Sequence, residues 1–173
     1  MKRAFAAVCC IVFLPLPALA REKHAPATPM TDQQFIDLAA QTDMLEAHLG
    51  QMAQNQAVGQ DVKSYAETLV TDPTKDYQQL TEMATKDNFS VPKGLDSERD
   101  KMIEPFDKLK GNAFDSRYIH ETIEGYTKAI DVYTRESKDA QNSDIKNYAA
   151  ATLPTLNKQL DGAKDLEKKI DKK

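Results

Sequence analysis

Residues 30–52 read MTDQQFIDLAAQTDMLEAHLGQM and decide the fold class. Thr31 and Gln34 have the spacing of a capping box, in which each side chain bonds the backbone N–H of the other residue at a helix start. Met30 and Phe35 flank the box, where a hydrophobic staple forms. Residues then repeat every three or four positions on one face, which predicts an amphipathic helix from about residue 32 to 55. This face consists of Phe35, Leu38, Thr42, Leu45, Leu49 and Met52.

The same period predicts three further long helices and one short helix. The long helices are expected over about residues 60–87, 112–139 and 143–170. Pro73 and Pro154 fall inside two of them and should bend those helices rather than end them. Asn112 and Ser143 are the predicted N-caps of the last two helices.

The short helix is expected over about residues 97–109 and should end at Gly111. Its inward side chains are predicted to be Met102, Phe106 and Leu109, with Pro105 bending the helix. No segment alternates with the period of two that a strand requires, and no solenoid repeat is found. The sequence therefore predicts an all-α four-helix bundle, with the extra short helix in the crossover connection.

The first twenty residues have the layout of a bacterial signal peptide. Lys2 and Arg3 precede an apolar run, and Ala18 and Ala20 occupy the two positions that a signal peptidase reads. We expect cleavage after Ala20; a retained N-terminal anchor is the alternative. The predicted organisation is a signal peptide at 1–20, a disordered tether at 21–30 and a helical bundle at 31–170, in a periplasmic or secreted protein.

Charge and cysteine content narrow the function classes. Cys9 and Cys10 both lie in the predicted signal, so the mature chain should have no thiol for a disulfide, a metal site or a nucleophile. Losing Lys2 and Arg3 with the signal would change the net charge from −4 to −6. An acidic chain without a basic stripe is not expected to bind nucleic acid, and no membrane-spanning segment is expected after cleavage.

The sequence contains no recognisable catalytic or cofactor-binding motif. His120-Glu121 begins like a zinc-protease motif, but Glu124 stands where the second His belongs. The other histidines, His24 and His48, also lack a partner at helical spacing, so all three are interpreted as surface residues. We therefore expect no catalytic residue, metal or cofactor, and a protein that is not an enzyme.

Four residues interrupt the apolar faces of the predicted helices. Pro73, Tyr126 and Gln159 take core-facing positions in three different long helices, and Glu46 flanks the face of the first. A buried polar group without a partner costs roughly 1–3 kcal/mol, so Glu46, Tyr126 and Gln159 are expected to hydrogen-bond one another. Either this cluster fixes the helix register, or it is the remnant of a ligand site.

Several stretches resemble a bacterial exported family of ferritin-like bundles, domain-of-unknown-function family 4142. The most specific is the Gly-x-x-Phe-Asp-x-x-Tyr segment within residues 109–118. The weaker matches are residues 35–40, Glu46, Gly50, Ala53, residues 62–66, residues 69–72, Tyr148, Ala149 and residues 153–156. The resemblance implies an exported ferritin-like bundle, but it implies no settled activity.

The same resemblance gives the interrupting residues a meaning. The histidines typical of the family fall on Pro73, Tyr126 and Gln159 in this chain, while Asp72 and Glu46 remain. A degenerate site is therefore predicted at Glu46, Asp72, Pro73, Tyr126 and Gln159. The favoured function is a non-enzymatic envelope protein with a binding or stress-related role and an unknown envelope partner. The alternatives are a ferritin-like metal or redox protein using carboxylates, and an amphipathic-helix binder of apolar partners.

Overall fold

The computed structural model describes residues 30–171, which are almost entirely helical, as the sequence predicts. The predicted signal peptide, nearly all of the predicted tether and His24 lie outside these residues. The elements are α1 (Asp32–Gln56), α2 (Gln60–Lys86), α3 (Ser97–Ile103), the 3₁₀ helix η1 (Glu104–Lys108), α4 (Asn112–Asp139) and α5 (Ser143–Ile170).

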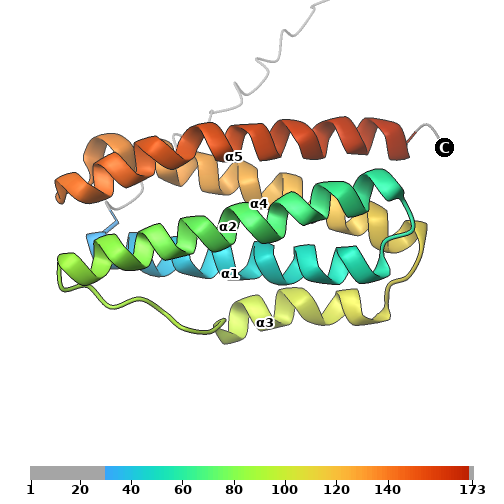
Figure 1. Cartoon of the computed structure of the whole chain (residues 1–173), viewed down its shortest axis with the longest axis horizontal. Coiled ribbons are helices and arrows are strands. Elements are labelled where there is room, and N and C mark those ends of the chain that lie inside the picture. The colour runs from blue at the N-terminus through green and yellow to red at the C-terminus, as the bar shows by residue number, and fades with distance from the viewer. Residues whose placement is uncertain (1–29, 172–173) are drawn as a thin grey trace, which may run out of the picture.

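The four long helices form two antiparallel hairpins that pack side by side (Figure 1). α1 and α2 make the first hairpin and α4 and α5 the second, and α1 packs on α4 while α2 packs on α5. The connection from α2 to α4 runs back along the length of the bundle, so α2 and α4 point the same way (Figure 1). α3 and η1 lie in this crossover, and α3 lies against α1. This arrangement confirms the predicted bundle with a helical crossover.

Side chains of α1 and α2 hold the crossover in place. The Gln41 amide donates to the Gly94 carbonyl at 2.9 Å and accepts from the Asp96 backbone N–H at 2.9 Å. The Gln33 amide donates to the Ser90 carbonyl at 2.8 Å, and the Tyr77 hydroxyl donates to a crossover carbonyl farther along. These hydrogen bonds pair backbone groups of the crossover that have no partner in a helix.

Each hairpin turn is bound by a carboxylate of the other hairpin. Asp115, buried at the start of α4, accepts backbone N–H bonds from Val58 at 3.1 Å and Gly59 at 2.8 Å. Asp32, at the start of α1, accepts from the backbone N–H groups of Gln141 and Asn142 at 3.2 and 3.1 Å. The two ends of the bundle are therefore fixed by charge-assisted hydrogen bonds that cross between hairpins.

The predicted capping box of α1 is present, whereas two other predicted caps are wrong. Asn142 caps α5 and accepts from the two following N–H groups, so Ser143 is the first helical residue. Gly111 occupies the N-cap position of α4 at a φ of 63°, so Asn112 begins that helix instead of capping it. A left-handed backbone favours glycine, which explains why Gly111 stands at this turn.

The core matches the predicted apolar face of α1 only in part, since Phe35, Leu45 and Leu49 are buried but Leu38, Thr42 and Met52 are half-buried. α2 continues through Pro73, as predicted, and the proline ring is buried. Pro105 lies not in a bent α-helix but at the start of η1, where the chain tightens to a 3₁₀ helix. Met102 was expected to face inward and is 42% exposed, because the short α3 turns Ile103 and not Met102 toward the core. Within residues 30–171, no helix has the length and apolar character needed to cross a membrane.

Candidate functional site

Two carboxyl side chains of α1 lie inside the bundle. Glu46 is 4% exposed and Asp43, one turn earlier, is 5% exposed. Oε2 of Glu46 and Oδ2 of Asp43 have no hydrogen-bond partner among the described residues. Carboxyl groups without partners are expensive to bury, so this pair marks the interior of α1 as unusual for a helical core.

Burial changes the protonation of both groups. Desolvation raises the pKa of Glu46 from 4.5 to about 8, so this side chain is mostly neutral at pH 7. Desolvation also raises the pKa of Asp43 well above its usual range, and the nearby charges of Asp76 and Glu46 raise it further. The pKa of Asp76 on α2 is raised to about 6, mainly by burial of its carboxyl group.

Tyrosines surround the Glu46 carboxyl. Burial raises the pKa of Tyr118 and Tyr126 on α4 well above the usual value, and the charge of Glu46 adds to both shifts. Burial also raises the pKa of Tyr65 on α2, and the charge of Glu46 raises it further. The hydroxyls of Tyr118 and Thr122 are also buried, and a hydrogen bond with Thr122 partly offsets the raised pKa of Tyr118. The centre of the bundle is therefore a polar region of carboxyl, phenol and hydroxyl groups that includes an unpaired oxygen of Glu46.

Gln159 of α5 belongs to a separate hydrogen-bond network. Its amide donates to the Asp72 carboxylate at 2.6 Å, and its Oε1 accepts from the Thr68 hydroxyl at 3.2 Å. The Tyr65 hydroxyl donates to the Gln159 backbone carbonyl at 2.7 Å. The prediction that Glu46, Tyr126 and Gln159 hydrogen-bond one another is wrong. The Gln159 side chain is instead bonded to Asp72 and Thr68, which both lie on α2.

The structure nevertheless brings most of the predicted degenerate site together. Glu46 and Tyr126 are electrostatic neighbours, and Tyr65 connects them to Gln159, which in turn holds Asp72. Pro73 is buried beside Asp72 on α2 and offers no polar side-chain atom.

Sequence reasoning missed four residues of this interior. Asp43 lies three positions before Glu46 and therefore shares its helix face. Tyr118 and Thr122 stand at intervals of four before Tyr126, which is the spacing of a single face on α4. Tyr65 lies one position before the buried Ala66 on α2, and nothing in the sequence singles out its hydroxyl.

Glu46 lines a hollow between α1, α3 and α4, which we call the Glu46 pocket. Its volume is about 260 Å³, and α4 contributes Gly125 directly opposite the carboxyl. Charged residues at its edge are Glu98, Arg99 and Lys128, and Thr42 adds a hydroxyl. The remaining wall is apolar and consists of Leu38, Leu45, Met102, Ala129 and Val132. A smaller hollow of about 70 Å³ adjoins it and shares Glu46, Gly125 and Met102.

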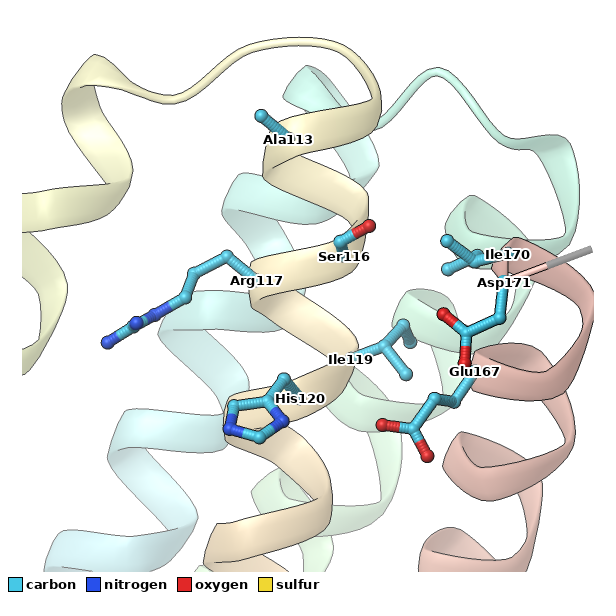
Figure 2. Close-up of a pocket in the computed structure, with 8 residues that line it drawn as sticks. All are labelled: Ala113, Ser116, Arg117, Ile119, His120, Glu167, Ile170 and Asp171. Carbon is cyan, nitrogen blue, oxygen red and sulfur yellow. The ribbon is translucent and has the colours of Figure 1, made fainter. Parts of the chain in front are cut away.

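A second hollow, of about 410 Å³, lies between the start of α4 and the end of α5 (Figure 2). Arg117 extends from α4 away from α5, whereas Glu167 comes from α5 and Asp171 follows its last residue (Figure 2). Arg117 pairs with Glu121 on its own helix at 2.6 Å, and His120 lies 3.4 Å from Glu124. No unpartnered buried polar atom of the described chain lines this hollow, so we assign the candidate site to the Glu46 pocket.

The described residues do not form an evident metal centre. In residues 30–171, no group of three or more His, Cys, Asp or Glu side chains could hold a metal ion. His48 and His120 are both exposed.

The fold and the interior define a four-helix bundle with one helical crossover and a polar centre built from carboxyl and phenol groups. The chain belongs to the family described as Domain of unknown function (DUF4142), whose model matches residues 17–166. The matched region contains the Gly-x-x-Phe-Asp-x-x-Tyr segment. In this structure the segment supplies the turn at Gly111 and the Asp115 carboxylate that binds the turn between α1 and α2.

A solved structure shares this fold. CopM in the Cu(II)-bound form has a TM-score of 0.68 and 15% sequence identity, and the match covers 82% of this chain and 99% of CopM. At this identity the likeness establishes the fold alone. No curated protein sequence matches the chain.

Proposed function

We propose that this chain is an exported, non-enzymatic binding protein of the bacterial envelope that holds a small ligand in the Glu46 pocket. The observation that supports this most strongly is the buried, unpartnered carboxyl of Glu46 in a hollow with otherwise largely apolar walls. Small-molecule sites combine these features: apolar walls for affinity and a few polar groups for orientation.

The energetics favour an occupied pocket. Leaving a buried polar atom unpaired costs roughly 1–3 kcal/mol, and a ligand group that pairs with Glu46 removes this cost. The wall offers Met102, whose flexible thioether adapts to differently shaped ligands and is exposed at the crossover. Gly125 keeps the space next to the carboxyl free of a side chain.

Export is supported by the residues before the bundle. The apolar run and the small-residue site at Ala18 and Ala20 are those of a secretory signal. The intact mass of the protein recovered from the periplasm or medium tests this directly. A chain beginning at Arg21 supports export with cleavage, and a mass that retains residues 1–20 contradicts it.

Binding can be tested with the exposed methionine as a reporter. The protein is labelled with ¹³C in its methionine methyl groups and titrated with small apolar fragments, and binders should shift the Met102 resonance. Val132→Trp fills the pocket and should abolish the shift. Ile130→Trp is the matched control, since Ile130 is also a half-buried α4 residue but does not line this pocket. If no fragment shifts Met102, or if both tryptophan variants respond like the parent, the proposal fails.

Carboxylate metal binding is a second candidate, favoured by Asp43 and Asp76. Their charges oppose each other across α1 and α2, and a hard cation would relieve that repulsion. Calorimetry with Ca²⁺ and Mn²⁺ on the parent and on Asp43→Asn tests it, since only the parent should bind. The third candidate, an opened bundle that binds apolar partners, predicts binding of an apolar dye that Val132→Trp leaves unchanged.

A further inference from the structure

We propose that the Glu46 pocket selects small apolar molecules that carry an ammonium group, and that the ammonium pairs with the Glu46 carboxylate. This inference rests on the proposed function, because it names the ligand class of the same pocket. It follows from the distribution of charge around the pocket, from the donors and acceptors available in it, and from the protonation of its deepest group.

The cations near the pocket already have partners. Arg99 lies 2.9 Å from Asp96, and Lys128 lies 3.3 Å from Glu124. An anionic ligand would therefore have to break an existing ion pair to find a positive charge. Glu46, in contrast, lines the pocket and has a buried carboxyl oxygen without a partner among the described residues.

The acids also outnumber the bases around this hollow and its smaller neighbour. Four glutamates, Glu46, Glu98, Glu121 and Glu124, stand against two cations, Arg99 and Lys128. At pH 7 protonated Glu46 adds no charge and Arg117 pairs with Glu121, so the negative charge that attracts a cation appears only when Glu46 ionises on binding. The apolar walls in turn favour a cation attached to a hydrocarbon or aromatic group over a hydrated inorganic ion.

The polar atoms available inside the pocket match an ammonium group. An ammonium has three N–H donors and no acceptor. Ionised Glu46 is an acceptor only, and the Thr42 hydroxyl, one turn earlier on the same face of α1, is a further acceptor. A ligand carboxylate could accept only from the Thr42 hydroxyl and from a protonated Glu46, and ionised Glu46 would repel it.

Pairing with an ammonium must change the protonation of Glu46. Burial keeps this carboxyl mostly protonated at pH 7 in the free protein. The groups that face it are Asp43 from α1, Tyr65 from α2, and Tyr118 and Tyr126 from α4, and all have pKa values raised by burial. None of them supplies a positive charge, so the incoming ammonium must supply it. On binding, the ammonium keeps its protons and Glu46 loses one to the buffer.

Calorimetry with three matched probes tests the inference. They are 2-phenylethylamine, 2-phenylethanol and 3-phenylpropionate, which place an ammonium, a hydroxyl and a carboxylate on the same aromatic group. At pH 7 we expect the amine to bind at least about tenfold more tightly than the alcohol, a difference of about 1.4 kcal/mol. Repeating the titration in two buffers of different ionisation enthalpy should show release of nearly one proton with the amine and none with the alcohol.

Variants separate the inference from the proposed function. Glu46→Gln should remove both the preference for the amine and the proton release while keeping the affinity for the alcohol, and the exposed Glu104→Gln is the control. Val132→Trp should bind none of the probes. If the alcohol or the carboxylate binds the parent as well as the amine does, the ammonium inference is wrong, although the pocket still binds ligands. If no probe binds and no fragment shifts Met102, both proposals fail. Should Glu46→Gln not fold, the buffer dependence of the parent still decides: amine binding without proton release overturns the inference.

Discussion

A Cβ atom at Gly125 of α4 would lie 3.1 Å from Oε1 of Glu46 on α1. A side chain at position 125 would therefore displace the Glu46 carboxyl by a few tenths of an ångström. At this level α1 and α4 approach each other around a carboxyl group, whereas nearer the start of α1 the rings of Phe35 and Tyr133 pack together. The stability of the bundle should then depend on the charge state of Glu46.

Stability should fall as the pH rises between about 4.5 and 8. The pKa of Glu46 is about 8 in the folded state and near 4.5 when it is exposed, so folding favours the protonated form. This contribution is fully present below pH 4.5 and is lost as the pH rises through 8. Since one pKa unit corresponds to about 1.4 kcal/mol, the loss should amount to a few kcal/mol.

Urea unfolding at several pH values measures this dependence. Glu46→Gln cannot ionise, so it should flatten the curve, although Asp43 leaves a residual slope of the same sign. The exposed Glu104→Gln should retain the slope of the parent. Identical slopes in the parent and in Glu46→Gln would mean that Glu46 is solvated.

Asp115→Ala should destabilise the protein by about 3 kcal/mol or more. Asp115 is buried and accepts the backbone N–H groups of Val58 and Gly59, and hydrogen bonds to charged groups contribute about 1.5–3 kcal/mol each when buried. The midpoint of urea unfolding measures the loss. Asp107→Ala, which removes an exposed carboxylate of η1, should stay within about 0.5 kcal/mol of the parent. Equal stability of the two variants would show that the hydrogen bonds to Asp115 contribute nothing to the free energy of unfolding.

The two helical prolines should respond differently to substitution by alanine. An interior proline costs about 3 kcal/mol relative to alanine. Pro154 is exposed, so Pro154→Ala should gain most of this in thermal unfolding, whereas Pro73→Ala also loses the packing of a buried ring and should gain less. A larger gain for Pro73→Ala than for Pro154→Ala would contradict this comparison.

The idea of a degenerate metal site has its own test. The triple variant Pro73→His, Tyr126→His and Gln159→His places three imidazoles on α2, α4 and α5, near Asp72 and Glu46. Imidazole favours zinc, so the triple variant should bind Zn²⁺ tightly in calorimetry and gain thermal stability with the metal. Each single variant should gain little. A folded triple variant that binds no better than the parent would show that these positions do not converge, and tight binding by the parent would show that the site is not degenerate.

The helix pattern could be predicted because caps and apolar periods are local signals. The capping box at Thr31 and the glycine at position 111 lie within one turn of the boundaries that they set. Met102 was placed wrongly because the short α3 contains too few turns to define a face, and its orientation depends on how the crossover packs on α1. Ser143 was chosen over Asn142 although both are good N-caps, since the sequence does not show which one leaves the helical conformation.

The candidate site was predicted only in part, for a different reason. Glu46, Tyr126 and Gln159 were recognisable as polar residues at buried positions of amphipathic helices. Their hydrogen-bond partners depend on which helices are neighbours. Because α2 packs on α5, Gln159 bonds Asp72, and an oxygen of Glu46 is left without a partner. The pocket itself needs three elements far apart in the sequence, α1, α3 and α4, so no local pattern could reveal it.

We infer that the Glu46 carboxyl is desolvated, has an oxygen without a partner and is available to a ligand. Titration of Glu46 itself is the direct test. The side-chain carboxyl carbon can be followed by ¹³C NMR as a function of pH, with the signal assigned by its absence in Glu46→Gln. We expect a midpoint near pH 8 in the free protein, and a lower midpoint when 2-phenylethylamine is bound. A midpoint near 4.5 in the free protein would show that water or an unrecognised partner already satisfies this carboxyl, and would contradict the account.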